Sequence, residues 1–248
     1  ERLVKATTLP RWFAVAALTI GLLVPIGLAV GFVVLPGPTR GLLAGDGRNG
    51  SVIETLTILV LIPAILVGAW SLFTRPGRTA TRAVRIWLAL WTLAAFYFAG
   101  EEASWGQWFF HWRTPMALER VNKQHETNLH NVSPWFNQKP QAFAEMFIAV
   151  AGWMLPSWRL LVERRSGAAR WNAPQWADWV LAPAPVIPSA LFHTITKVCI
   201  WLPGFQRNTM GHPELQEFAV ALFMVLYVIA LVLRLPAYNA KAPAASTA

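Results

Sequence analysis

The feature that most constrains this chain is a series of long apolar runs separated by polar loops. The first run, residues 12–35, contains 24 residues and no charged side chain. About 20 apolar residues in a helix are enough to cross the hydrocarbon core of a bilayer. Inside a bilayer the backbone must satisfy its own hydrogen bonds, and a long single segment does this only as a helix. The runs therefore predict an all-α membrane protein.

The composition agrees with this prediction. Only 13% of the 248 residues are charged and 55% are hydrophobic, whereas a soluble domain has about 25% charged residues. We predict a polytopic membrane helix bundle of about six transmembrane helices, forming one domain over residues 1–235, with a disordered tail at 236–248. The predicted spans are about 12–35, 52–73, 86–110, 142–162, 176–202 and 217–235. Three prolines, at positions 183, 185 and 188, make the fifth span the least regular.

The distribution of Lys and Arg predicts an orientation. Of the 21 basic residues, 13 fall on the side that carries both termini and the second and fourth loops. Cytoplasmic loops are enriched in Lys and Arg, so we expect N-in/C-in topology as a multi-pass protein of the bacterial inner (cytoplasmic) membrane. The expected partners are membrane lipids, with anionic lipid on the cytoplasmic side. Nucleic acid is not an expected partner, because no basic–aromatic pattern suited to it is present. The single Cys199 excludes an intramolecular disulfide. The sequence leaves the oligomeric state open.

The acidic residues have the opposite distribution. Nine of the 12 fall on the predicted outer half. Glu54, Glu145 and Glu217 each open a predicted span there, while Glu101 and Glu102 close one. Ionisable groups within spans are costly and commonly mark functional sites. The pattern predicts a shared acidic pocket near the periplasmic face, although Ser51 and Glu54 also have the spacing of a helix capping box.

The stretch from Gly100 to Asn131 contains most of the candidate site residues. In a continuous helix, Glu101, Ser104 and His111 would lie near one face. Glu126 and His130 are spaced i, i+4, and carboxylate–imidazole pairs bind zinc, iron or manganese. The predicted metal ligands are Glu126, His130 and Glu102. The predicted catalytic residues are Glu101, Glu102, Glu217 and Ser104, and the residues expected to bind substrate or support the site are Gln107, Asn128, Asn131 and Glu54.

Each of these assignments has a structural alternative. Glu101 or Glu102 could form an ion pair with Lys123, Lys197 or Arg207, and the segment around Glu126 could be a solvated loop. Glu214 is expected to be a first-turn acid that complements a helix dipole. His193 and Lys197 share a helix face at i, i+4, with Lys197 as a counter-ion for the acids. His125, Glu119 and Glu214 are not included in the predicted site.

The motif GEEASWGQ (Gly100–Gln107) and the string N-x-Q-x-ETNLHN (Asn122–Asn131) resemble a family of bacterial multi-pass membrane proteins to which no activity is assigned. The resemblance implies a membrane location and a site in this stretch, without a reaction. The chain departs from the family at His125, where the family usually has Gly, and at Trp108, where it has Arg. A looser analogy of layout connects it with intramembrane hydrolases of the alkaline-ceramidase type, whose paired histidines on a late span are absent here.

The leading functional hypothesis is a metal-dependent intramembrane hydrolase that acts on a lipid or amphiphile, because a bound metal can bring the pKa of water to about 7. The second is a proton- or ion-coupled transporter, since intramembrane acids mark ion paths and the fifth span is interrupted. The third is a non-catalytic subunit that binds lipid or pigment.

Overall fold

The structure, a computed structural model, describes residues 9–44, 51–122, 126–129, 132–166, 177–202 and 212–241. Every regular element within these ranges is helical. Five helical segments are long and apolar enough to cross a membrane. They are α2 (Arg11–Val34), α4 (Val52–Phe73), α6 (Arg82–Glu102), the continuous run α9–η2–α10 (Pro134–Phe147, Ile148–Met154 and Leu155–Ser166), and α13 (Pro213–Lys241).

Shorter elements connect the spans. They are α3 (Gly37–Ala44), α5 (Arg75–Arg78), η1 (Ser104–Gly106), α7 (Gln107–Phe110), α8 (Met116–Glu119), α11 (Ala177–Val180), η3 (Ala184–Val186) and α12 (Ile187–Cys199). Helix α3 lies between the first two predicted spans. Helix α8 begins directly after Pro115.

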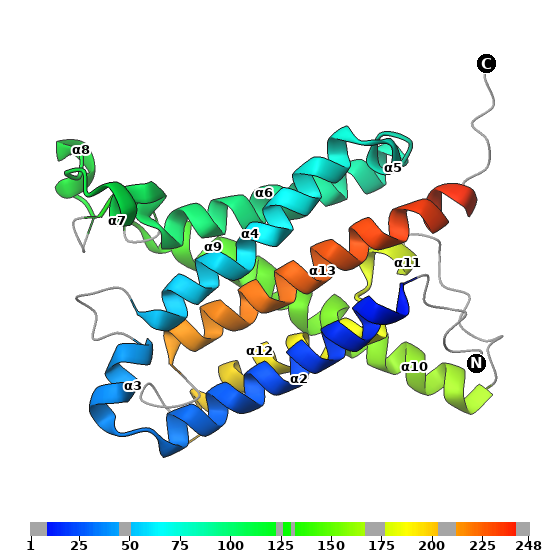
Figure 1. Cartoon of the computed structure of the whole chain (residues 1–248), viewed down its shortest axis with the longest axis horizontal. Coiled ribbons are helices and arrows are strands. Elements are labelled where there is room, and N and C mark those ends of the chain that lie inside the picture. The colour runs from blue at the N-terminus through cyan, green and yellow to red at the C-terminus, as the bar shows by residue number, and fades with distance from the viewer. Residues whose placement is uncertain are drawn as a thin grey trace.

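Helix α13 lies at the centre of the bundle, with α4 and α6 on one side and α12 on the other (Figure 1). Its buried Tyr227 connects two neighbours. The Tyr227 hydroxyl accepts a hydrogen bond from Trp87 Nε1 at 2.9 Å and donates one to the Val180 carbonyl at 2.6 Å. Because a buried hydroxyl is costly without partners, these two bonds fix α6 and α11 against the middle of α13.

The predicted fifth span, residues 176–202, is not one continuous helix among the residues described. Pro183, Pro185 and Pro188 lack the N–H that a helix interior needs, and the chain forms α11, η3 and the 13-residue α12 instead. At 1.5 Å per residue α12 is roughly 20 Å long, short of the roughly 30 Å hydrocarbon core. Helices α11, η3 and α12 nevertheless carry the chain back along the bundle to the start of α13. As a result, the start of α2 and the end of α13 lie at the same end of the bundle (Figure 1).

Three predicted boundaries are wrong. The third span ends at Glu102 and not at 110, because Ser104, Trp105 and Gly106 all have positive φ angles, of 45°, 55° and 99°. The fourth helix begins at Pro134, earlier than 142, where Ser133 accepts a cap bond from the Trp135 N–H. Helix α13 runs to Lys241, so residues 236–241 of the predicted disordered tail are helical. Residues 242–248 lie outside the described part.

The fourth span contains a π-helical segment, η2, in its middle. Pro156 follows it and cannot donate the backbone bond that a regular α-helix would require there. Gly152 in η2 permits close packing, since a Cβ at this position would lie 3.0 Å from Ala190 Cβ and 3.1 Å from the Phe223 ring. The three helices η2, α12 and α13 therefore approach closely next to the second polar cluster described below.

Candidate cation site and polar network

Three carboxylates meet where α6 ends and α13 begins. Glu102 is the last residue of α6, and Glu214 and Glu217 lie one turn apart at the start of α13. One oxygen from each of the three lies within 4.8 Å of the other two. Because Ca²⁺ binds oxygens at 2.3–2.6 Å, two oxygens on one ion can be up to about 5 Å apart. The three side chains are thus placed to share one divalent cation.

Glu102 is buried, with 8% of its surface exposed, and accepts no hydrogen bond from the residues described. Four further carboxylates, those of Glu217, Glu214, Glu54 and Glu101, act on it electrostatically, and all of them repel a negative charge there. A buried carboxylate is expensive unless it is protonated, paired or bound to a metal. This cluster is therefore short of positive charge.

Glu54 approaches the cluster from a third helix while also capping its own. The Glu54 N–H donates to Ser51 Oγ at 2.9 Å, and the Ser51 N–H donates to Glu54 Oε2 at 3.2 Å. This reciprocal pair is the capping box predicted from the sequence. The Glu54 carboxylate still acts electrostatically on Glu102 and Glu217. Glu54 therefore caps its own helix and also adds negative charge near the cluster.

His212 precedes α13 and fixes the start of that helix. Its Nδ1 accepts a hydrogen bond from the Glu214 N–H at 3.3 Å, and its ring packs against Phe32 at a centroid distance of 6.2 Å. Burial lowers the pKa of His212 below its usual value, because the charged ring would lose solvation. A neutral ring with its lone pair on Nδ1 suits this capping role.

A buried hydrogen-bond network begins two residues after Glu102. Ser104 Oγ donates to Glu126 Oε2 at 3.0 Å, and Asn128 Nδ2 donates to the same oxygen at 2.6 Å. Asn122 Nδ2 in turn donates to the Asn128 carbonyl and to its Oδ1, at 2.9 and 2.8 Å. These bonds join the two motif strings that the sequence placed in one site.

Other polar side chains of the same stretch hold its backbone in place. Gln107 Oε1 accepts from both the N–H and the hydroxyl of Thr127, at 2.7 and 2.9 Å. Glu101 accepts from Trp105 Nε1 at 2.6 Å and from the Leu129 N–H at 2.8 Å. Glu101 and Gln107 therefore act as clamps between residues 101–107 and 126–129.

The structure separates the predicted metal ligands. Glu102 belongs to the three-carboxylate cluster, whereas Glu126 is hydrogen-bonded in the network, and His130 and Asn131 lie outside the described residues. Residues 126–129 are not helical, so the i, i+4 argument for Glu126 and His130 has no helical basis in the described part. His111 likewise does not share a helix face with Glu101, because α6 has already ended.

Sequence reasoning missed three residues that matter here. Glu214 was assigned a dipole role, although its i, i+3 spacing to Glu217 on one helix was a usable signal. Asn122 supports Asn128, and its Oδ1 accepts from the Glu126 N–H at 3.2 Å. Trp105 holds Glu101 from a left-handed conformation, which no sequence pattern indicated.

Glu145 was predicted to open its span, but the helix begins earlier, at Pro134, and Glu145 lies in the last turn of α9. Lys197 Nζ from α12 is 2.6 Å from Glu145 Oε1, and His193 Nε2 is 3.8 Å from the same oxygen. His193 is 3% exposed, and neither of its ring nitrogens has a hydrogen-bond partner among the residues that the structure describes. The expected counter-ion Lys197 thus makes its close contact with Glu145, and Glu145, His193 and Lys197 form a second polar cluster.

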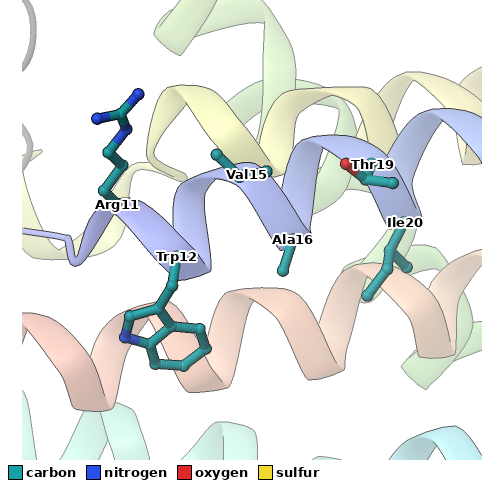
Figure 2. Close-up of a pocket in the computed structure, with 6 residues that line it drawn as sticks. All are labelled: Arg11, Trp12, Val15, Ala16, Thr19 and Ile20. Atoms are coloured by element: carbon teal, nitrogen blue, oxygen red, sulfur yellow. The ribbon is translucent and has the colours of Figure 1, made fainter.

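An open hollow of about 680 Å³ lies along the first turns of α2 (Figure 2). It is at the other end of the bundle from the carboxylates. Among the described residues Arg11 is the one charged side chain that lines it and no acid does, so it is not part of the candidate site. The lining residues are Arg11, Trp12, Val15, Ala16, Thr19 and Ile20.

No family model, curated protein or solved structure matches the chain. The chemistry of the site is therefore inferred from its geometry alone.

Proposed function

We propose that this protein is a divalent-cation-dependent membrane hydrolase whose cation is held by Glu102, Glu214 and Glu217. The observation that carries the proposal is the convergence of these three carboxylates within 4.8 Å, with Glu102 buried and repelled by four other acids. A divalent cation would compensate this excess negative charge. It would also lower the pKa of a water molecule and so make a nucleophile for hydrolysis available at neutral pH.

The ligand types favour a hard cation. Carboxylate oxygens suit Mg²⁺, Ca²⁺ and Mn²⁺, whereas Zn²⁺ and Fe²⁺ sites usually include imidazole or thiolate. Among the zinc, iron and manganese that the sequence suggested, the described ligands favour manganese. The network of Ser104, Glu126 and Asn128 would supply hydrogen bonds to the substrate beside the cation.

The surroundings favour an amphiphilic substrate. The segment after α6 exposes Phe109, Phe110 and Trp112, with the rings of Phe110 and Trp112 stacked 5.7 Å apart. Trp and other aromatic side chains concentrate at membrane–water interfaces. A cation site at the end of the spans, next to such a segment, would meet the head group of a lipid and not its acyl chains.

The proposal includes a placement in the membrane. The chain crosses the bacterial inner membrane six times, with the interrupted α11–η3–α12 segment as the fifth crossing and both termini in the cytoplasm. The basic residues of α5, α10 and the start of α6 then contact anionic lipid, and the carboxylates open toward the periplasm.

Thermal unfolding of the purified protein with and without Mn²⁺ tests cation binding. Saturation at 100 times the dissociation constant would stabilise the wild type by about 2.7 kcal/mol. Glu102→Gln should abolish this gain and should also stabilise the cation-free protein, because it removes the buried charge. Glu119→Gln, an exposed acid on α8, is the control and should respond to Mn²⁺ like the wild type. A wild type that gains no stability from Mn²⁺, Mg²⁺ or Ca²⁺ would refute the proposal.

One observation favours a second candidate, an ion-coupled transporter. Glu145, His193 and Lys197 bring ionisable groups of α9 and α12 together between the helices, and such groups commonly line ion paths. Uptake of Mn²⁺ into proteoliposomes separates the two functions. A transporter would move the ion across the bilayer, whereas the hydrolase would bind it without net flux.

A further inference from the structure

One positively charged side chain, that of Lys197, acts electrostatically on the cation site but is paired with a carboxylate outside it. Lys197 lies in the last turn of α12, which packs along α13, and its charge acts on Glu217. Its Nζ is nevertheless 2.6 Å from Glu145 Oε1, on α9. The lysine thus pairs with a carboxylate outside the cation cluster and acts electrostatically on one inside it.

We propose that the ion pair with Glu145 restrains Lys197 from neutralising the carboxylate cluster and thereby keeps the cluster available for a divalent cation. This inference rests on the proposed cation site and assigns Glu145 and Lys197 as positioning residues for it. Neither residue is a ligand in the proposal.

The surroundings of Lys197 leave its side chain room to move. The Lys197 side chain is 40% exposed, so it is not fixed by packing. His193 Nε2 lies 3.8 Å from the same Glu145 oxygen and has no hydrogen-bond partner in the described part of the chain. His193 is therefore a second possible donor to Glu145. If Lys197 moved toward Glu217, Glu145 would still have a hydrogen-bond donor beside it.

The position of Glu145 follows from the helices around it. Helix α9 begins at Pro134, which places Glu145 in its last turn, immediately before the π-helical segment η2. Close packing of Gly152 against Ala190 holds η2 against α12. Since π-helical segments are frequent at functional sites, we assign this one the role of setting the distance between Glu145 and Lys197.

A double-mutant cycle measured by Mn²⁺ titration of the purified protein tests the inference. Glu145→Gln leaves the Lys197 charge uncompensated beside Glu217, and Mn²⁺ should bind about tenfold more weakly. Lys197→Met removes the competing charge, so its affinity should equal or exceed that of the wild type. The double variant should return to the Lys197→Met value, because Glu145 then has no lysine to restrain.

The ion pair of Arg159 with Glu163, at 2.8 Å in α10, provides a matched control. Glu163→Gln removes the same kind of partner far from the cluster and should leave Mn²⁺ affinity unchanged. If the wild type binds Mn²⁺ and Glu102→Gln does not, but Glu145→Gln binds like the wild type, the inference about Lys197 is wrong while the cation site stands. If the double variant binds as weakly as Glu145→Gln, the inference is also wrong, because the loss then does not depend on Lys197. If the wild type itself binds no Mn²⁺, the proposed function has failed.

Discussion

At the scale of single residues, Asn128 is the position of the polar network where we expect a substitution to cost the most stability. It is 1% exposed and bonds to Ser104, Glu126 and Asn122 at once. Each bond is worth about 1 kcal/mol, but a buried group left without a partner costs about 1–3 kcal/mol. The cost of losing Asn128 is therefore set by the neighbours that it leaves unpaired.

We expect Asn128→Ala to lower the free energy of unfolding by about 3 kcal/mol, because Asn122 and the Glu126 carboxylate lose a buried partner. Chemical denaturation in detergent micelles measures this change. Asn239→Ala, at an exposed contact with Thr79, should cost less than about 1 kcal/mol. Equal effects of the two substitutions would show that the network around Asn128 does not contribute specially to stability.

The residues also show how far the sequence could lead. Spacing and topology were enough to predict that Glu54, Glu101, Glu102 and Glu217 come from neighbouring span ends. Spacing could not predict which acid would be clamped and which left unpaired, because that depends on the left-handed turn at Ser104, Trp105 and Gly106. That turn directs Trp105 back onto Glu101 and leaves Glu102 without a donor among the described residues.

At the scale of helices, the contact between α4 and α6 depends on one small residue. A Cβ at Gly68 would lie 2.2 Å from Thr92 Oγ1, far inside van der Waals contact. Small residues allow membrane helices to approach closely, and their packing replaces the hydrophobic effect that is missing within lipid. Because α4 carries Glu54 and α6 carries Glu102, this contact also sets the distance between two acids of the site.

Gly68→Ala should therefore destabilise the protein by about 1–3 kcal/mol through overpacking. Adding Thr92→Ala should restore part of the loss, since the nearest remaining atom, Cβ of residue 92, lies 3.2 Å away. Gly27→Ala in α2, where no atom lies within 4 Å, should be neutral or stabilising because Ala favours helix. Thermal unfolding of the three variants provides the comparison, and a Gly68→Ala protein as stable as the wild type would contradict the close packing.

Helix boundaries were the part of the fold that hydropathy predicted least well. The predicted third span ran from Ile86 to Phe110, past the two acids Glu101 and Glu102. The sequence did not show that the residues after them form the turn that ends α6 at Glu102. The prolines of residues 183–188 did mark the irregular fifth segment, since their effect on a helix is local and covalent. A helix break caused by the proline ring can thus be predicted from the sequence. The end of α6 at Glu102 could not, because it depends on tertiary hydrogen bonds.

At the scale of the whole molecule, an even number of crossings places both ends of the chain on one side. Five helices have the length and composition of spans, and five crossings alone would put the start of α2 and the end of α13 on opposite sides. They lie at the same end of the bundle (Figure 1), because α11, η3 and α12 carry the chain back. The short segment therefore brings the chain back to the end of the bundle where α2 begins, although it is too short to be recognised as a span.

Labelling of introduced cysteines tests this topology in intact cells. Cys199 is the one cysteine and is buried, so the wild type should react slowly with a membrane-impermeant maleimide. Met116→Cys, at a position 73% exposed on α8, should be labelled from the periplasm. Thr81→Cys, exposed before α6, should be labelled only after lysis, because the basic residues around it favour the cytoplasm. The reverse pattern would invert the orientation and turn the carboxylate cluster toward the cytoplasm, while labelling of both positions before lysis would exclude a bundle that separates them across the membrane.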